Sequence, residues 1–184
     1  MTDEERWVLF PILLSAHRTE WKEEYRKERD TILSAIGEEN VDRISHIGST
    51  AVEGLIAKPT IDILLEIKKD TDTTALISAL TTTGYICDRQ PWKPAPHLMF
   101  MKGYTPQGFQ GQAVHLHVRY RGDWDELYFR DYLQSHPEAA RAYGELKQRL
   151  QAKYRHDRDA YTNAKTDFIR HITSLAREET KKKY

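Results

Sequence analysis

Hydrophobic and polar positions repeat with two different periods along the first part of the chain. Residues 20–36 place their apolar side chains mostly on one stripe of a helix, and residues 41–47 alternate apolar with polar side chains, as a strand does. Residues 61–67, IDILLEI, form a nearly continuous apolar run that is typical of a central strand buried on both faces. Residues 113–120 read as a further strand.

Shorter elements lie between and after these strands. Residues 73–83 read as a helix, and residues 85–88 and 97–102 read as strands. Residues 103–112 contain three glycines and a proline and are expected to be a mobile loop. The last third is helical, with apolar positions that face the core and charged positions of residues 138–154 that form a solvated face. The sequence predicts an α+β (α/β) fold with a mixed sheet of about five strands.

Length and charge limit the function classes. The 184 residues suit one domain, which we divide into an N-terminal extension (1–16), an α/β core (17–122), C-terminal helices (123–178) and a frayed tail (179–184). A formal net charge of zero does not favour binding to duplex nucleic acid. The apolar stretch VLFPILL is too short to span a membrane, and a single cysteine with no signal peptide favours the cytoplasm.

Candidate chemistry is concentrated in the stretch HIGSTAVEGLIAKPTIDILLEI, residues 46–67. Gly48, Ser49 and Thr50 form a turn directly after a strand, where free backbone amides and hydroxyl groups can face a phosphate. Lys58 adds a positive charge before the next strand, and Asp62 lies within that strand. Together they could hold a phosphate and a divalent metal. The alternative is that Asp62 is only a salt-bridge partner.

Four segments of this chain are similar to the GrpB-like (glutamate-rich protein B) family, which belongs to the nucleotidyltransferase fold superfamily. They are residues 46–67, HLHV at 115–118, FRDYLQSHPEAARAYGELKQRL at 129–150 and DRDAYTNAKTDFI at 157–169. The family usually has proline at the position of Glu53, and the resemblance extends from about His17 to Ala176. It implies a nucleotidyltransferase-like mixed β-sheet core with a helical C-terminal third. With the apolar run at 61–67, it also implies that this strand is central and is flanked by the strands at 41–47 and 113–120.

The superfamily signature is only partly present. Gly48 and Ser49 match its Gly-Ser pair and Asp62 matches its first acid, but the second acid is replaced by Leu64. Nucleotidyl transfer in this fold uses two Mg²⁺ ions held by carboxylates, so the clamp is incomplete. Glu66 shares the face of Asp62, but four residues of strand separate their Cα atoms by about 13 Å. We therefore expect Glu66 to pair with a lysine or arginine.

Two histidines stand on the strand where the third acid is expected. His115 and His117 share one strand face, and with Asp62 they have the composition of a two-histidine, one-carboxylate metal site. Such a site would take Mn²⁺ or Zn²⁺ rather than Mg²⁺. The alternative is that both rings are hydrogen-bonded within the site. His46 and His97 are weaker candidates.

The helical third adds basic and aromatic candidates. Tyr161 and Lys165 are four residues apart on one helix face, where they could stack on a base and reach a phosphate. The alternative is a lysine that lies over a tyrosine ring. Arg130 could bind phosphate or pair with Glu126, four residues before it.

Two functions are consistent with these residues. The first is a nucleotidyltransferase that moves a nucleoside monophosphate, with Asp62 and His117 as catalytic residues and Gly48 and Ser49 at the triphosphate. The second is a non-catalytic module that binds a nucleotide or phosphorylated small molecule. Under both, we expect Ser49, Lys58, Asp62 and the two histidines to line one concave pocket.

Overall fold

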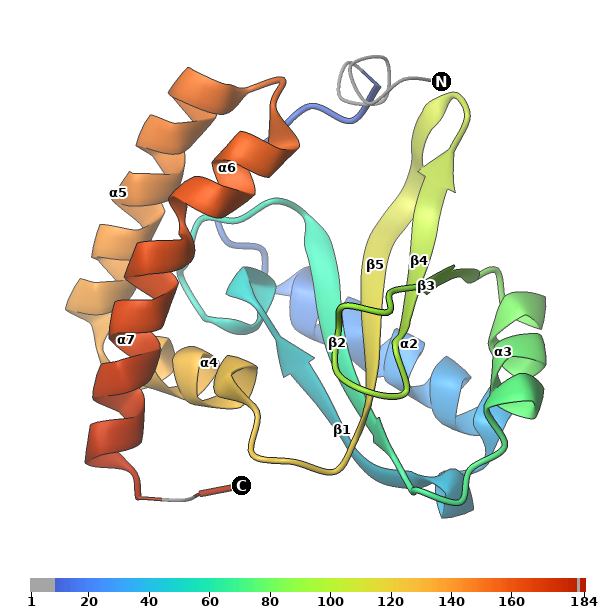
Figure 1. Ribbon diagram of the computed structural model, residues 1–184. Helices are drawn as coiled ribbons and strands as arrows, with labels where there is room; N and C mark the ends of the chain where they lie inside the picture. The colour runs from blue at the N-terminus through green and yellow to red at the C-terminus, as the bar shows by residue number, and fades with distance from the viewer. Residues whose placement is uncertain (1–8, 182) are drawn as a thin grey trace.

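The computed structural model describes residues 9–181, 183 and 184, and its centre is a five-stranded mixed sheet. The strands lie in the order β1-β2-β5-β4-β3, and Figure 1 shows them between two groups of helices. Their bounds are β1 Val41–Ile47, β2 Thr60–Ile67, β3 Ile86–Arg89, β4 Leu98–Thr105 and β5 Gly108–Tyr120. The predicted α+β fold with a mixed sheet is confirmed.

Strand β2, which carries Asp62, lies between β1 and β5. It pairs antiparallel with β1 and parallel with β5, so the prediction for its neighbours is confirmed. The register sets Asp62 opposite His115 and Leu64 opposite His117. Residues directly opposite one another point to the same face of a sheet, so these four side chains share one face.

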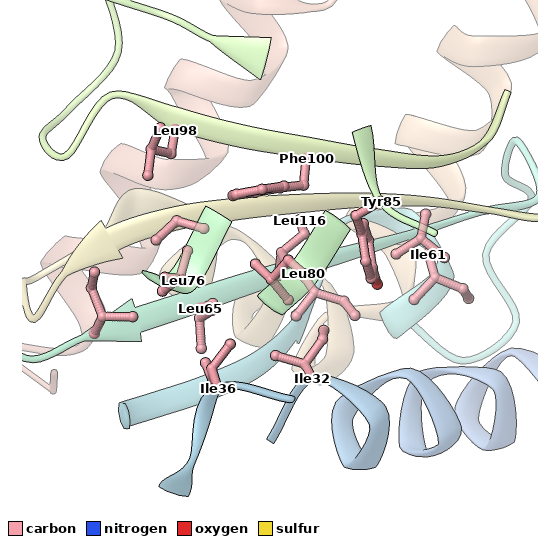
Figure 2. Packing of buried hydrophobic residues seen from close by; sticks show 14 of the residues in the cluster. Ile32, Ile36, Ile61, Leu65, Leu76, Leu80, Tyr85, Leu98, Phe100 and Leu116 are labelled. Carbon is pink, nitrogen blue, oxygen red and sulfur yellow. The ribbon is translucent and has the colours of Figure 1, made fainter. Parts of the chain in front are cut away.

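The other face of the sheet carries the main hydrophobic core. Helices α2 (Glu20–Ile36) and α3 (Thr73–Thr82) cover this face, and Figure 2 shows their side chains packed against those of the strands. Ile61 and Leu65 of β2 point into this core and are fully buried. The apolar run of β2 therefore has a simple cause: its odd-numbered side chains face α2 and α3, and Asp62, Leu64 and Glu66 face the opposite side.

The C-terminal helices gather at one side of the sheet (Figure 1). They are α4 Asp125–Ser135, α5 Pro137–Tyr154, α6 Arg158–Ala164 and α7 Thr166–Glu179. Leu127 of α4 packs on Ile47 and Leu64, which attaches the helices to the polar face of the sheet. None of the described helices is long and apolar enough to cross a membrane.

The glycine-rich segment 103–112 is not a mobile loop, so that expectation is wrong. It is the end of a long β4–β5 hairpin in which Tyr104 pairs with Phe109. Gly103 has φ of +85°, and a Cβ atom there would lie 2.6 Å from the carbonyl oxygen of Gln112. Glycine is needed at this position to make the register shift between Lys102 and Tyr104, and the strand continues beyond it.

Both ends of the described chain pack on the body. Ile12 is fully buried, and Ser15 forms a β-bridge with Ala57. The predicted extension 1–16 lies partly outside the described residues. At the other end, Lys183 forms an ion pair with Asp131, and the Tyr184 hydroxyl donates a hydrogen bond to the same carboxylate. Lys183 and Tyr184 therefore contact α4, and the frayed tail at 179–184 stays a prediction.

Candidate functional site

The turn that follows β1 is shaped by Gly48. Its backbone has φ of 73° and ψ of −172°, a conformation that is essentially restricted to glycine. A Cβ atom on Gly48 would lie 2.7 Å from Oδ2 of Asp62. The glycine therefore allows the short helix η2 (Ser49–Ala51) to approach the carboxylate of β2.

Thr50 stabilises this turn through a buried hydrogen bond. Its side chain is only 3% exposed, and its hydroxyl donates a hydrogen bond to the carbonyl of Thr60, at 3.1 Å. His46 Nε2 lies 2.9 Å from the same hydroxyl oxygen and must be the donor, because the threonine hydrogen is already used. Burial lowers the pKa of His46 to about 4, so the ring is neutral. We expected the Thr50 hydroxyl to face a phosphate, but this contact occupies it.

Asp62 is in contact with both predicted histidines. Its Oδ1 lies 3.4 Å from His115 Nδ1 and 3.8 Å from His117 Nε2, and all three side chains are 19–28% exposed. Burial alone would raise the pKa of Asp62, but interactions with the neighbouring His115 and His117 rings hold it well below its usual range. The Tyr104 hydroxyl lies 2.7 Å from His115 Nε2 and fixes that ring from the far side. Asp62 is therefore a partly accessible, ionised carboxylate.

No second carboxylate is available next to Asp62. Leu64 is fully buried between Ile47 and Leu127. Glu66 is also fully buried; it accepts hydrogen bonds from Arg43 Nη2 at 2.9 Å and from the Gly122 amide at 3.0 Å. The prediction that Glu66 pairs with a cation is confirmed.

The residues do not fit a two-ion magnesium clamp, which needs several carboxylates around one point. In the described part of the chain, no group of three or more His, Cys, Asp or Glu side chains is arranged to hold a metal ion. We therefore derive no reaction step through a metal here. A single Mn²⁺ or Zn²⁺ ion at Asp62 stays a prediction.

A buried lysine supports the turn from α5. Lys147 is 3% exposed, and its amine donates hydrogen bonds to Ser49 Oγ at 2.9 Å and to the Ile56 carbonyl. Burial, and then repulsion from Lys165 and Lys58, lower its pKa to about 7. The expectation that the charged positions of residues 138–154 form a solvated face is wrong at Lys147. Its position, four residues after Tyr143 on the buried stripe of α5, was the signal in the sequence.

Two further lysines lie close to the ring of Tyr161. The Lys165 amine is 4.4 Å from the centre of the Tyr161 ring and the Lys58 amine is 5.7 Å from it. Burial and then repulsion from Lys58 lower the pKa of Lys165 to about 7, and burial and then Arg158 lower that of Lys58 to about 8. Tyr161 is 1% exposed, so it leaves no free face for a base. The alternative, lysines that lie over a tyrosine, is confirmed.

Arg158 completes this basic cluster, which we define as Lys58, Lys147, Arg158 and Lys165. The sequence analysis missed Arg158, although it begins α6 within a family-like segment. Its Nη1 donates a hydrogen bond to the Phe10 carbonyl at 3.0 Å. Among the ion pairs of residues 9–181, 183 and 184, none involves a member of the basic cluster. The four residues therefore have no ion-pair partner in this part of the chain, although Lys147 contacts Ser49 and Asp62 attracts Lys58 and Lys165.

Arg130 lies on the other side of the turn. Its Nη1 donates a hydrogen bond to the His46 carbonyl at 3.0 Å, and its Nε donates to Asp131 at 2.8 Å. The expected pair with Glu126 is wrong, because Glu126 accepts two hydrogen bonds from Arg119 instead. Arg130 lines a separate cavity of about 620 Å³ with His46 and Thr50.

The remaining weak candidate is outside the site. His97 is exposed in the loop before β4, and its Nδ1 lies 2.6 Å from the Lys93 carbonyl. The structure thus brings Asp62, His115 and His117 into contact, and it places Ser49 against Lys147 of the basic cluster. A common concave pocket for Ser49, Lys58 and these three residues stays a prediction.

The five-stranded mixed sheet followed by four C-terminal helices is a nucleotidyltransferase-like fold. The comparison with solved structures agrees: the Cid1 poly(U) polymerase bound to MgGTP matches with a TM-score of 0.50 and 15% identity, over 83% of this chain and 47% of that chain. At this identity the likeness shows the fold alone.

The comparison with sequence families identifies the protein more specifically than the fold does. The sequence model described as GrpB protein matches residues 11–175, and the chain belongs to this family. The conserved protein GrpB from Enterococcus faecalis matches with a TM-score of 0.79 and 26% identity, over 91% of this chain and 98% of that chain. Glutamate-rich protein GrpB of Alkalihalophilus pseudofirmus is 32% identical over 88% of this chain and 93% of its own length. A UPF0157 protein of Pseudomonas aeruginosa is 38% identical over 88% of this chain and 66% of its own length.

Proposed function

We propose that this protein binds a nucleotide or another phosphorylated small molecule at Ser49 and the basic cluster. The observation that carries the proposal is the set of four converging cations that have no ion-pair partner among the described residues. Lys147 is buried and the other three side chains are partly exposed, and like charges held close together repel one another, so such a cluster favours a mobile counter-ion. A phosphate group supplies the charge and several acceptor oxygens at once.

The lowered lysine pKa values support the same ligand class. The pKa values of about 7 for Lys147 and Lys165 show that their charged forms are costly while the cluster has no counter-ion. A polyphosphate among these amines would favour their charged forms and raise both pKa values. Asp62 attracts Lys58 and Lys165, but one carboxylate cannot neutralise four cations.

Transfer of a nucleoside monophosphate is the second candidate function. The likeness to Cid1, named as a poly(U) polymerase, and the ionised Asp62 next to His117 favour it. The buried Leu64 at the second acid position weighs against it, because a reaction of this kind depends on metal ions held by several carboxylates. Binding of the phosphorylated ligand is common to both functions, and it is the one that the geometry supports best.

A thermal-shift screen tests the proposal. Sodium tripolyphosphate, nucleoside triphosphates and nucleoside monophosphates are added separately, with and without Mg²⁺ or Mn²⁺. A ligand that binds only the folded state raises the melting temperature by mass action. We expect a rise with tripolyphosphate that does not need a metal. No shift with any phosphorylated compound at millimolar concentration would contradict the proposal.

A further inference from the structure

A cavity of about 470 Å³ adjoins the basic cluster and extends beyond the residues of the proposed phosphate site. Lys58 and Arg158 of the cluster also line this cavity. Its volume is within the range typical of small-molecule sites. A molecule in the cavity would therefore meet two of the four cations at one end.

The sheet connects the cavity directly to Asp62. Thr60 and Ala113 line the cavity and are opposite one another on β2 and β5. Asp62 and His115 are the next pair on the same face of the same two strands. Two residues of strand span about 7 Å, so the lining of the cavity begins about 7 Å along the strand from Asp62. This is comparable to the spacing of neighbouring phosphates in a nucleic-acid strand.

Part of the cavity lining is apolar and exposed. In the described part of the chain, the exposed large hydrophobic side chains are Leu13 at 46%, Ile86 at 55%, Trp92 at 76% and Phe109 at 44%. Leu13 and Phe109 both line this cavity. Two of the four exposed apolar side chains thus face the same hollow, next to two cations.

Phe109 is held in place although it is exposed. Its ring centre is 5.0 Å from that of Phe10, at an interplanar angle of 78°, and 5.2 Å from that of Tyr104. Tyr104 in turn stacks on His115, with ring centres 5.6 Å apart and an angle of 16°. A fixed aromatic ring at the mouth of a cavity is a suitable platform for a flat group.

We propose that this cavity binds the base and sugar of a nucleoside triphosphate whose phosphates lie on the basic cluster. The inference rests on the proposed function and narrows its ligand from any phosphorylated compound to a nucleotide. An apolar wall beside cations fits a ligand that is aromatic at one end and anionic at the other. Arg18 and Glu24, which also line the cavity, offer polar groups to the edge of a base.

Calorimetric titrations with ATP, GTP, CTP, UTP and sodium tripolyphosphate distinguish the phosphate site on the basic cluster from the base and sugar site in the cavity. We expect at least one nucleotide to bind more tightly than tripolyphosphate. Phe109→Ala should weaken that nucleotide about tenfold, because stacking of a base on an aromatic ring is worth roughly 1–3 kcal/mol, and leave tripolyphosphate unchanged. Leu13→Ser should act in the same direction. Trp92→Ala removes an aromatic ring that is exposed outside this cavity, at 76%, and is the control.

Lys58→Ala should weaken both kinds of ligand, since its amine serves the phosphates. If tripolyphosphate binds but no nucleotide binds more tightly, or if Phe109→Ala and Leu13→Ser leave nucleotide affinity unchanged, the cavity inference is overturned and the phosphate site stands. If neither tripolyphosphate nor any nucleotide binds, the proposed function itself is overturned, and the inference with it.

Discussion

Replacement of Lys147 by methionine tests whether burial without a counter-ion lowers the pKa of this amine. In the folded chain the pKa of Lys147 is about 7, below the ordinary value of 10.5, because the amine is buried and repelled by Lys165 and Lys58. Between these two values the unfolded chain holds a proton that the folded chain has released. The free energy of unfolding must therefore rise with pH in this range.

The size of this effect follows from the two pKa values. Between pH 7 and pH 9, Lys147 alone should raise the free energy of unfolding by about 2 kcal/mol. Lys147→Met should remove this contribution, so its stability should increase less with pH than that of the wild type. Tyr143, Lys58 and Lys165 surround the amine and stay in place in this variant.

Urea unfolding at pH 7, 8 and 9 measures the difference. Lys153→Met, at an exposed position of the same helix, is the matched control and should follow the wild type. Equal pH dependence of stability in the wild type and in Lys147→Met would refute the assignment of Lys147 as a buried amine with a lowered pKa. If the variant's free energy of unfolding were lower by the same amount at every pH, the assignment would also be refuted. Such a constant difference reports lost contacts and not the loss of a titrating group.

Three other substitutions test the turn and Asp62. Ser49→Ala should weaken tripolyphosphate binding by about ten- to hundredfold, since a hydrogen bond to a charged group is worth roughly 1.5–3 kcal/mol; unchanged affinity in calorimetry would exclude this role. Gly48→Ala should be more destabilising in urea than Gly54→Ala, because both have positive φ but only Gly48 faces a nearby atom, Oδ2 of Asp62; equal losses would argue against this contact. If one Mn²⁺ or Zn²⁺ ion binds at Asp62, titration calorimetry should detect it in the wild type and not in Asp62→Asn, whereas equal binding would remove Asp62 from any metal role.

The central elements could be predicted from the sequence because each has a strong local pattern. The run IDILLEI is apolar apart from two acids, which both lie on one face. This pattern predicts a central strand, and the run forms β2. The contacts of Asp62 with His115 and His117 follow from the parallel register of β2 and β5. The buried Glu66 could be recognised as an ion-pair residue from its distance to Asp62 along the strand.

Other features depend on tertiary contacts that the local pattern does not show. Segment 103–112 has the glycines of a loop, but its positive-φ glycines serve a bulged hairpin. Lys147 looks like a solvated lysine until α5 is packed against the loop that carries the Ile56 carbonyl. Arg158 reaches the site only because α6 folds back after α5. A helical pattern fixes which face a residue occupies but not which distant charges it meets.

The most direct test of the account is calorimetric titration of sodium tripolyphosphate into the metal-free protein at pH 7 and low ionic strength. We expect the wild type to bind, and Lys58→Met and Lys165→Met to bind at least about tenfold more weakly, since each loses a charged hydrogen bond. Lys69→Met, which changes an exposed lysine outside the basic cluster, should bind as the wild type does. No binding to the wild type, or equal binding to all four proteins, would contradict the claim that the basic cluster is a phosphate site.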